Sequence, residues 1–285
     1  MINDLRITVL VENTARGINV LSEHGLAFWI EADGCHILFD TGQGGVLCHN
    51  AQCLGIPLHT AEMVAISHGH FDHTGGLSDA LVGVNRTTAA GADLFLHPDA
   101  LNKKYAKEKM PPHREIGIPR LDENDLRKRA RKLVFSTEPT QLMKGVYLTG
   151  RVPRRNDYED TGGPFYLDQE CTEPDPLLDD QALYIETPVG TVVVLGCAHS
   201  GVVNTLDYIT DLTGRDHIHA VMGGMHLGRA TSQRLLATSE VIRRYGIKKI
   251  GTAHCTGAKA TSYLWSQFPD ECFECCVGAT FRINQ

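Results

Sequence analysis

The sequence predicts an α/β protein in which a central pair of β-sheets is sandwiched between helices. Three observations support this fold class. In each half of the chain, pairs of strand-like runs are followed by alternating helices and strands. The 285 residues, 42% of them hydrophobic, are enough to bury a large core. The sequence has neither an internal repeat nor a low-complexity tract, so we expect one domain over residues 1–285.

The predicted strands are short apolar runs that are bounded by turn residues. They cover residues 6–11, 26–31, 36–40, 63–67, 94–96, 133–135, 146–149, 182–186, 191–196, 220–222 and 247–252. Pro188-Val189-Gly190 separates two of these runs, as the turn of a hairpin would. Helices are predicted where apolar residues recur every three or four positions, from Val202 up to Gly214 and from Gln233 up to Gly246.

Two polar, proline-bearing stretches interrupt this alternation, at about 102–132 and 150–180. Segments of this length without a clear element of their own are uncommon in a compact domain and often form lids or substrate-binding loops. We therefore expect both excursions to lie over the active site.

Charge and composition exclude several classes of function. The net charge of −7 argues against a protein that binds nucleic acid along its whole surface. No apolar run approaches the roughly 20 residues of a membrane span, and the N-terminus enters a strand pattern without a signal peptide. Nine cysteines, an odd number in a chain of this size, favour reduced thiols and a cytoplasmic protein.

The strongest functional signal is a dense run of potential metal ligands after the predicted strand 63–67. His68 and His70 are two residues apart and so point the same way in an extended loop. Asp72 and His73 follow at a turn. Imidazole and carboxylate ligands suit zinc first, and iron or manganese as alternatives. The other interpretation is a polar loop whose histidines only form hydrogen bonds, but so dense a run at a strand end rarely has a structural use.

This run resembles the His-x-His-x-Asp-His signature of the metallo-β-lactamase superfamily. Residues 39–42 are similar to the first motif of that superfamily, and residues 251–257 are similar to its last. Further segments point to one branch, which is named for 7,8-dihydropterin-6-yl-methyl-4-(β-D-ribofuranosyl)aminobenzene 5′-phosphate synthase. In chain order they are residues 50–56, 67–77, 149–154, 178–183, 196–201, 223–227 and 254–257, so the resemblance spans the chain.

The resemblance implies a four-layer αβ/βα sandwich with the site at one edge. It implies two metal ions per chain, which we expect to be zinc. His68 and His70 would hold the first ion, and the second would be held by Asp72, His73 and His254. Asp40 would support the metal loop without binding metal.

The middle motifs depart from the superfamily pattern, which has a third histidine for the first metal and a bridging aspartate. The hairpin at 182–195 is preceded by Asp179-Asp180 without a histidine, and Cys197 stands where the aspartate would be. His199, two residues further on, is the nearby imidazole able to complete the first site. We expect His199 to bind and Cys197 to lie beside the metals without bridging them; ligation by Cys197 is the alternative.

The predicted function is that of a metal-dependent enzyme acting on a phosphorylated or pterin-like small molecule. The metals would either supply hydroxide for hydrolysis or assist the displacement of pyrophosphate. Asp72 and His226 are the predicted catalytic residues, and Arg151, Arg154 and His226 the predicted substrate contacts. The alternatives are a metal-binding protein with degenerate catalysis and a ribonuclease-like enzyme, which would need a basic channel. The sequence predicts no membrane or nucleic-acid partner and leaves the oligomeric state open.

Overall fold

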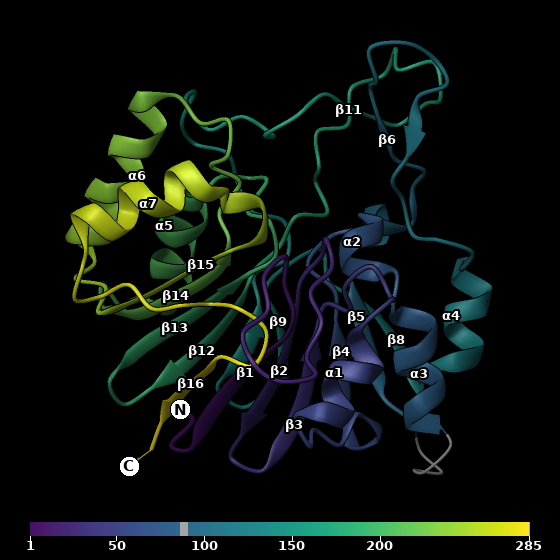
Figure 1. Cartoon of the computed structure of the whole chain (residues 1–285), viewed down its shortest axis with the longest axis horizontal. Helices are drawn as coiled ribbons and strands as arrows, with labels where there is room; N and C mark the ends of the chain where they lie inside the picture. The colour runs from purple at the N-terminus through teal and green to yellow at the C-terminus, as the bar shows by residue number, and fades with distance from the viewer. Residues whose placement is uncertain (86–90, 285) are drawn as a thin grey trace.

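The computed structural model describes residues 1–85 and 91–284. Two β-sheets pack face to face, and helices cover the outer face of each (Figure 1). The four-layer αβ/βα sandwich predicted from the sequence is therefore confirmed. Within the described ranges, every helix falls short of the length and apolar character that a membrane crossing requires.

The first sheet has seven strands in the order β16-β1-β2-β3-β4-β5-β8. They are antiparallel from β16 to β3 and parallel from β3 to β8. Their bounds, in this order, are Thr280–Ile283, Leu5–Val11, Ala27–Ala32, Cys35–Phe39, Met63–Ala65, Asp93–Leu96 and Lys132–Phe135.

The second sheet has six strands in the order β15-β14-β13-β12-β10-β9. Strands β13 to β15 are parallel, and the other pairs are antiparallel. Their bounds, in this order, are Lys249–Ala253, Ile218–Gly224, Gly190–Leu195, Leu183–Thr187, Val146–Leu148 and Thr140–Met143.

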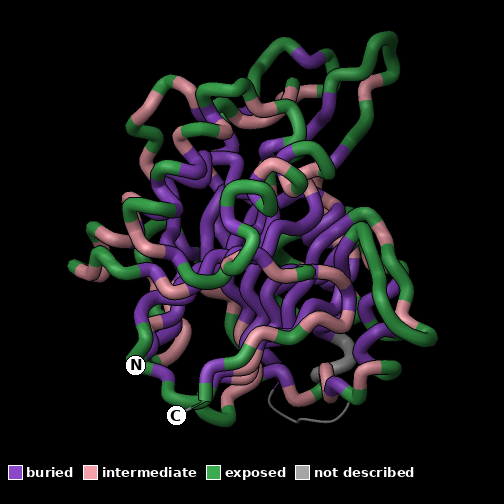
Figure 2. The backbone as a smooth tube through the Cα atoms, turned by 60° about the vertical axis from the view of Figure 1, so that its left-hand side comes forward, coloured by how far each residue is buried: buried purple, intermediate pink, exposed green. Residues whose placement is uncertain are grey.

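The main core lies between the two sheets. Phe28 and Ile30 of the first sheet and Val192 and Val194 of the second belong to it. All six residues of β13 are buried, because helices cover one face of this strand and the first sheet covers the other. Figure 2 shows the buried backbone concentrated in the strands at the centre and the exposed backbone in the loops around them.

The outer layers complete the sandwich. Helices α1 (Leu47–Cys53), α3 (Leu77–Asn85) and α4 (Glu123–Arg129) cover the first sheet, and α5 (Val202–Thr213), α6 (Ser232–Arg244) and α7 (Ala258–Gln267) cover the second. The predicted end of α5 is confirmed: Gly214 follows it with φ +63°, a left-handed conformation that glycine adopts without strain.

The two excursions meet in a third, small sheet. Strand β6 (Tyr105–Ala106) pairs with β7 (Arg114–Glu115) of the same excursion and with β11 (Phe165–Tyr166) of the other. Figure 1 shows β6 and β11 together beyond one end of the two large sheets. The second half of the first excursion contains α4 and packs on the first sheet instead.

All the predicted strands are present, with ends shifted by at most two residues. The two helices predicted at Val202 and Gln233 are α5 and α6. The sequence analysis missed α1, α3, α7, β9 and β16, together with the two-residue strands β6, β7 and β11. In α7 only Ala260 and Leu264 are buried, so its apolar periodicity is too weak to be recognised.

Candidate metal centre

The predicted ligands lie in loops that follow the carboxyl ends of neighbouring strands. His68 and His70 follow β4, His199 follows β13, and His254 follows β15 at the start of the short helix η3 (His254–Thr256). Asp72 and His73 lie in the single-turn helix α2 (Phe71–Thr74). In open α/β sheets the carboxyl ends of strands form the usual ligand site.

Three predicted site residues have a left-handed backbone. The φ angles of Asp40, His226 and His254 are +59°, +47° and +51°. Such a conformation costs a non-glycine residue roughly 1–3 kcal/mol and persists only where the surrounding structure holds it. These three conformations therefore lower the stability of the fold, and the surrounding structure holds the three side chains in fixed directions.

His68, His70 and His199 form the first group of candidate ligands. The Nε2 atom of His68 lies 3.0 Å from Nδ1 of His70 and 3.3 Å from Nε2 of His199. All three side chains are buried, and their candidate ligand atoms lie within 4.8 Å of one another. Three imidazole nitrogens that converge in this way match the donor set of a zinc-type site with an open position.

Hydrogen bonds fix the ring tautomers of His68 and His199. The Ser67 hydroxyl donates to Oδ2 of Asp40 (2.7 Å) and so accepts from Nδ1 of His68 (2.9 Å). Nδ1 of His199 donates to the carbonyl of Thr161 (2.8 Å). Because both Nδ1 atoms carry the proton, both Nε2 lone pairs face the group, as metal ligation requires.

Burial also keeps this group uncharged. Desolvation holds the pKa values of His68 and His199 well below their usual range and lowers the pKa of His70 to about 3. Neutral imidazole is the form that binds metal. The group is therefore ready to bind a cation at neutral pH.

The predicted second group is Asp72, His73 and His254. The structure brings Asp72 and His254 together with His24, whereas the candidate ligand atom of His73 lies with those of His68 and Cys197. Oδ2 of Asp72 lies 3.3 Å from Nε2 of His254 and 3.0 Å from Nε2 of His24. Burial raises the pKa of Asp72, but the hydrogen bonds from His24 and His254 outweigh it and hold this pKa well below its usual range. Nδ1 of His254 donates to Oδ1 of Asn13 (2.8 Å), which leaves its Nε2 for the site.

Asp40, the predicted supporting residue, bonds to residues of both loops that carry His68 and His73. Its Oδ1 accepts from the backbone N–H of Ser67, and its Oδ2 accepts from the Ser67 hydroxyl and from Nδ1 of His73, each at 2.7 Å. Burial would lower the pKa of His73, but the Asp40 carboxylate raises it to about 9. The hydrogen bond directs Nε2 of His73 toward the centre.

Asp179 and Asp180, which occupy a position without the expected histidine, support the loops instead. Oδ2 of Asp179 accepts from the N–H of Gly69, between His68 and His70 (2.7 Å). Oδ2 of Asp180 accepts from the N–H of Ser200, next to His199 (2.7 Å). Asp179 is also held by the buried ammonium of Lys104 at 3.0 Å. This network ties the first excursion to the metal loop.

Cys197 lies between the two groups. Its Sγ is 3.2 Å from Nε2 of His73 and is close to candidate ligand atoms of His68 and His199. Burial raises the pKa of this thiol well above its usual range, which favours the protonated form. The structure thus places Cys197 beside candidate ligands of both groups.

His226 lies next to the first group. Its ring centroid is 4.4 Å from that of His199, and its Nε2 donates to the carbonyl of Gly162 (3.2 Å). Its buried Nδ1 has no hydrogen-bond partner among the described residues. Because Nε2 carries the proton of this hydrogen bond, the lone pair of the ring is on Nδ1.

Two cavities adjoin the centre. A cavity of about 160 Å³, which we call the cluster cavity, is lined by residues of both groups together with Phe165 and Arg114. A cavity of about 410 Å³, which we call the basic cavity, shares Arg114, Phe165 and His226 with it and adds Lys107 and Arg229. The ring centroid of Phe165 is 4.9 Å from that of His70, so β11 lies against the metal group.

The structure places the predicted substrate contacts Arg151 and Arg154 elsewhere. Both are exposed, and neither lines the cluster cavity or the basic cavity. The Arg154 guanidinium donates to the carbonyl of Pro176 (3.2 Å). The positive charge beside the centre comes from Lys107, Arg114 and Arg229, which the sequence analysis did not single out.

Comparisons with known proteins agree with this geometry. The chain is 30% identical over 282 residues to the 7,8-dihydropterin-6-methyl-4-(β-D-ribofuranosyl)-aminobenzene-5′-phosphate synthase of Methanocaldococcus jannaschii, with 95% of this chain and 94% of the relative covered. The chain belongs to the metallo-β-lactamase superfamily, in the branch that contains this synthase. A second relative at 30% identity, an uncharacterised protein of the same archaeon, covers 90% of this chain and 93% of its own length.

Solved structures of the superfamily share the fold. Tm1679, described as a metal-dependent hydrolase of the β-lactamase superfamily, matches with a TM-score of 0.80 and 28% identity over 99% of this chain and all of its own. YhfI of Bacillus subtilis, a metallo-β-lactamase fold protein, matches with a TM-score of 0.59 at 12% identity, covering 98% of this chain and 99% of its own. No protein-family model matches the chain.

Proposed function

We propose that this chain joins a dihydropterin to a phosphorylated aminobenzene riboside, the chemistry that the name of its archaeal relative describes. The observation that carries the proposal is the basic cavity, which places Lys107, Arg114 and Arg229 directly beside the candidate metal centre. Guanidinium and ammonium groups are the usual protein ligands of phosphate. A phosphorylated substrate bound there would have its other end at the centre.

We propose two zinc ions, with iron or manganese as alternatives. His68, His70 and His199 would hold the first ion, and Asp72, His73 and His254 the second. The hydrogen bonds that hold the Nδ1 atoms of four of these residues support this assignment; the four are His68, His73, His199 and His254. Bound there, the ions would polarise phosphoryl oxygens and stabilise the negative charge of a leaving pyrophosphate.

The remaining steps fall to the side chains of this chain. In the coupling, the amine nitrogen forms a bond to the methylene carbon of the pterin, and the bond from that carbon to pyrophosphate oxygen breaks with its electron pair. His226 takes the proton that the amine loses, because its Nδ1 has no hydrogen-bond partner among the described residues and its side chain lines the basic cavity with Arg114. The carboxylate of Asp72 stays ionised and orients the rings of His24 and His254, to which it is hydrogen-bonded.

The small sheet of β6, β7 and β11 acts in this proposal as the lid of the single domain. Arg114 and Phe165, which lie in two of its strands, line both cavities. A lid that covers the reacting groups would exclude water and so favour transfer to the amine over hydrolysis. Only the first half of the 102–132 excursion takes part, because α4 lies on the first sheet.

We further propose that the protein works in the cytoplasm on small molecules. All nine cysteines are free thiols, as expected in a reducing compartment. The net charge of −7 disfavours the ribonuclease-like alternative. Hydrolysis of a phosphorylated substrate is the second candidate function, favoured by the similarity to Tm1679 at a TM-score of 0.80.

The test is to incubate the zinc-loaded protein with 6-hydroxymethyl-7,8-dihydropterin pyrophosphate, with and without 4-(β-D-ribofuranosyl)aminobenzene 5′-phosphate. Coupling predicts an adduct by mass spectrometry, with release of pyrophosphate that depends on the amine. Amine-independent release, or turnover of bis-p-nitrophenyl phosphate alone, would instead identify a hydrolase. Binding of metal without turnover of either substrate would identify the degenerate alternative.

Two variants assign the roles. His226→Gln should lower kcat by about 10²–10⁴-fold with little change in KM, since it removes the proton acceptor. Arg114→Gln should mainly raise KM for the phosphorylated amine. Arg151→Gln is the matched control and should change neither constant, because Arg151 lines neither cavity.

A further inference from the structure

A third cavity lies on the other side of His254. Its volume is about 620 Å³, within the range of roughly 300–1,000 Å³ typical of small-molecule sites. His254 lines both this cavity and the cluster cavity. The two spaces are therefore neighbours that share one candidate metal ligand as a wall.

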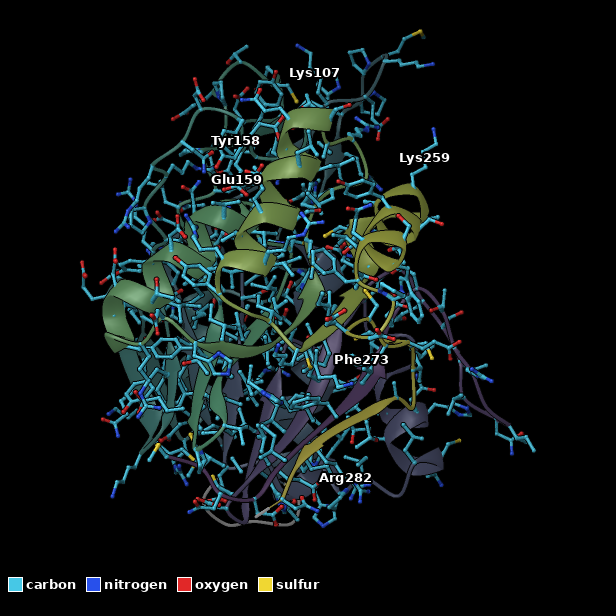
Figure 3. The ribbon with its side chains drawn as sticks, turned by 90° about the vertical axis from the view of Figure 1, so that its left-hand side faces the viewer. Lys107, Tyr158, Glu159, Lys259, Phe273 and Arg282 are labelled. Atoms are coloured by element: carbon cyan, nitrogen blue, oxygen red, sulfur yellow. The ribbon has the colours of Figure 1, made fainter. Side chains whose placement is uncertain are left out.

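Aromatic side chains distinguish this space, which we call the aromatic cavity. Trp265 of α7 and Phe273 line it, and Trp265 is 36% exposed although it is a large apolar side chain. Figure 3 shows Phe273 beneath α7, the helix that carries Lys259. Gly251 makes room for Phe273, because a Cβ at that position would lie 2.6 Å from the ring. The rings of Trp265 and Phe273 thus give the aromatic cavity flat apolar surfaces.

The charge of this cavity differs from that of the basic cavity. The charged residues that line it are Arg16, Glu274 and Glu12. Arg16 forms an ion pair with Glu274, and the Glu12 carboxylate accepts hydrogen bonds from the backbone N–H groups of Thr14 and His254. No positive charge is left over for a phosphate among these described residues. The basic cavity, by contrast, is lined by Lys107, Arg114 and Arg229 against the single acidic side chain of Glu108.

The segment that lines the aromatic cavity also positions His254. Oε1 of Glu12 accepts from the N–H of His254 (2.7 Å), and Oδ1 of Asn13 accepts from its Nδ1 (2.8 Å). A molecule held between this segment and α7 would therefore lie against the backbone that aims His254 into the centre. His254 would lie between that molecule and the cluster cavity.

We propose that the aromatic cavity binds the uncharged fused ring of the pterin, while the basic cavity binds the phosphate of the second substrate. This proposal rests on the proposed function, and it assigns the two halves of the product to opposite sides of the metal centre. Trp265 stacks on the pterin ring, because flat π-systems prefer offset stacking on an aromatic side chain. The reacting methylene group then points past His254 to the centre, where the amine arrives from the other side.

The experiment measures binding and needs no turnover. Isothermal titration calorimetry of the as-purified protein with 6-hydroxymethylpterin, which carries no phosphate, reports on the aromatic cavity. Ribose 5-phosphate, which carries no pterin, reports on the basic cavity. Each ligand is titrated into the free protein and into protein saturated with the other ligand, for the parent, Trp265→Ala, Trp265→Phe and Arg114→Gln.

We expect the pterin and ribose 5-phosphate to bind together. Trp265→Ala should weaken pterin binding by about tenfold or more, the size of effect that a stacking contact gives, and leave ribose 5-phosphate unchanged. Trp265→Phe, which keeps a flat ring, should restore most of the affinity, and Arg114→Gln should affect ribose 5-phosphate alone. Leu236→Ala, an exposed apolar residue of α6, is the matched control and should change neither.

Competition between the two ligands, full pterin affinity in Trp265→Ala, or no pterin binding to the parent would overturn the proposal. These outcomes are distinct from failure of the proposed function. If pterin binding depends on Trp265 but no adduct forms in the coupling assay, the cavity assignment stands and the coupling reaction is wrong. If adduct forms while Trp265→Ala binds pterin normally, coupling stands and the cavity assignment is wrong.

Discussion

The two halves of the candidate metal centre are built in different ways. His68, His70 and His199 are buried and neutral, and hydrogen bonds fix the rings of His68 and His199. The second group depends on the carboxylates of Asp72 and Asp40 and reaches solvent, because His24, which bonds Asp72, has a side chain that is 57% exposed. The first group is preorganised by burial and the second by charge.

This difference predicts different metal affinities. The imidazoles of the first group are buried and already neutral. A cation that binds them therefore competes with neither water nor a bound proton. A cation bound by the second group must displace a proton from His73, whose protonated form the Asp40 carboxylate stabilises. The exposed side chain of His24 also brings water close to this group. The first ion should therefore bind more tightly than the second.

The first prediction concerns His70. His70→Ala should lose most of the bound metal, because it opens the buried group, while the fold persists on strands that do not depend on the loop. Elemental analysis gives the metal content, and circular dichroism gives the fold. His49→Ala, a surface variant, is the control and should keep its metal. Equal metal content in His70→Ala and the parent would refute the ligand assignment.

Chelator titration tests the order of release. The parent should lose metal in two steps, the second group first. His199→Ala should abolish the tighter step and leave the weaker one, because a first site with two histidines has fewer than the three protein ligands of a catalytic zinc. A single step in the parent, or an unchanged tight step in His199→Ala, would show that the two groups do not differ as the structure suggests.

The pH dependence of the two steps should also differ. The pKa of His73 is raised to about 9, so below that pH a proton must leave before metal binds, and affinity in the weaker step should fall as the pH is lowered from 9 to 7. The fall should be roughly tenfold per pH unit, the value for one displaced proton. The pKa of His70 is lowered to about 3, so its protonation should not affect the tighter step in that range. Competition titrations with a metal indicator would measure the metal affinity of each step as a function of pH. The same pH dependence in both steps would contradict the prediction.

Much of the fold and part of this centre could be predicted from local sequence patterns. The valine-rich run of β13 and the glycine after α5 determine the local conformation of the chain. A strand and a helix end can therefore be recognised there from the sequence alone. The spacing of His68 and His70 likewise fixes their direction along one extended loop. His199 could be inferred because it follows the end of a recognisable hairpin.

The surroundings of the centre could not be predicted, because they depend on contacts between distant segments. Arg114 reaches the site only because β6 and β7 of one excursion pair with β11 of the other, and two-residue strands leave no periodic pattern. Lys104 and Asp179 are 75 residues apart, and no pattern in the sequence marks His24. Arg151 and Arg154 cluster in the sequence, but both are exposed and neither lines the two cavities beside the centre.

The last prediction concerns Cys197, which lies between the two groups without belonging to either. We expect it not to bridge the metals, because burial raises its pKa and favours the protonated thiol, whereas a metal ligand must be the thiolate. Cys197→Ser should then keep both chelator steps and its full metal content.

Cobalt(II) substitution gives the direct measurement, because sulfur bound to cobalt produces intense charge-transfer absorption in the near ultraviolet. The parent should lack this absorption, and Cys255→Ser serves as the control for the neighbouring thiol. Absorption that is present in the parent and Cys255→Ser but lost in Cys197→Ser would make Cys197 a ligand. The two groups would then share a sulfur atom, and the difference in their affinities should shrink, since neither ion could leave without disturbing the other.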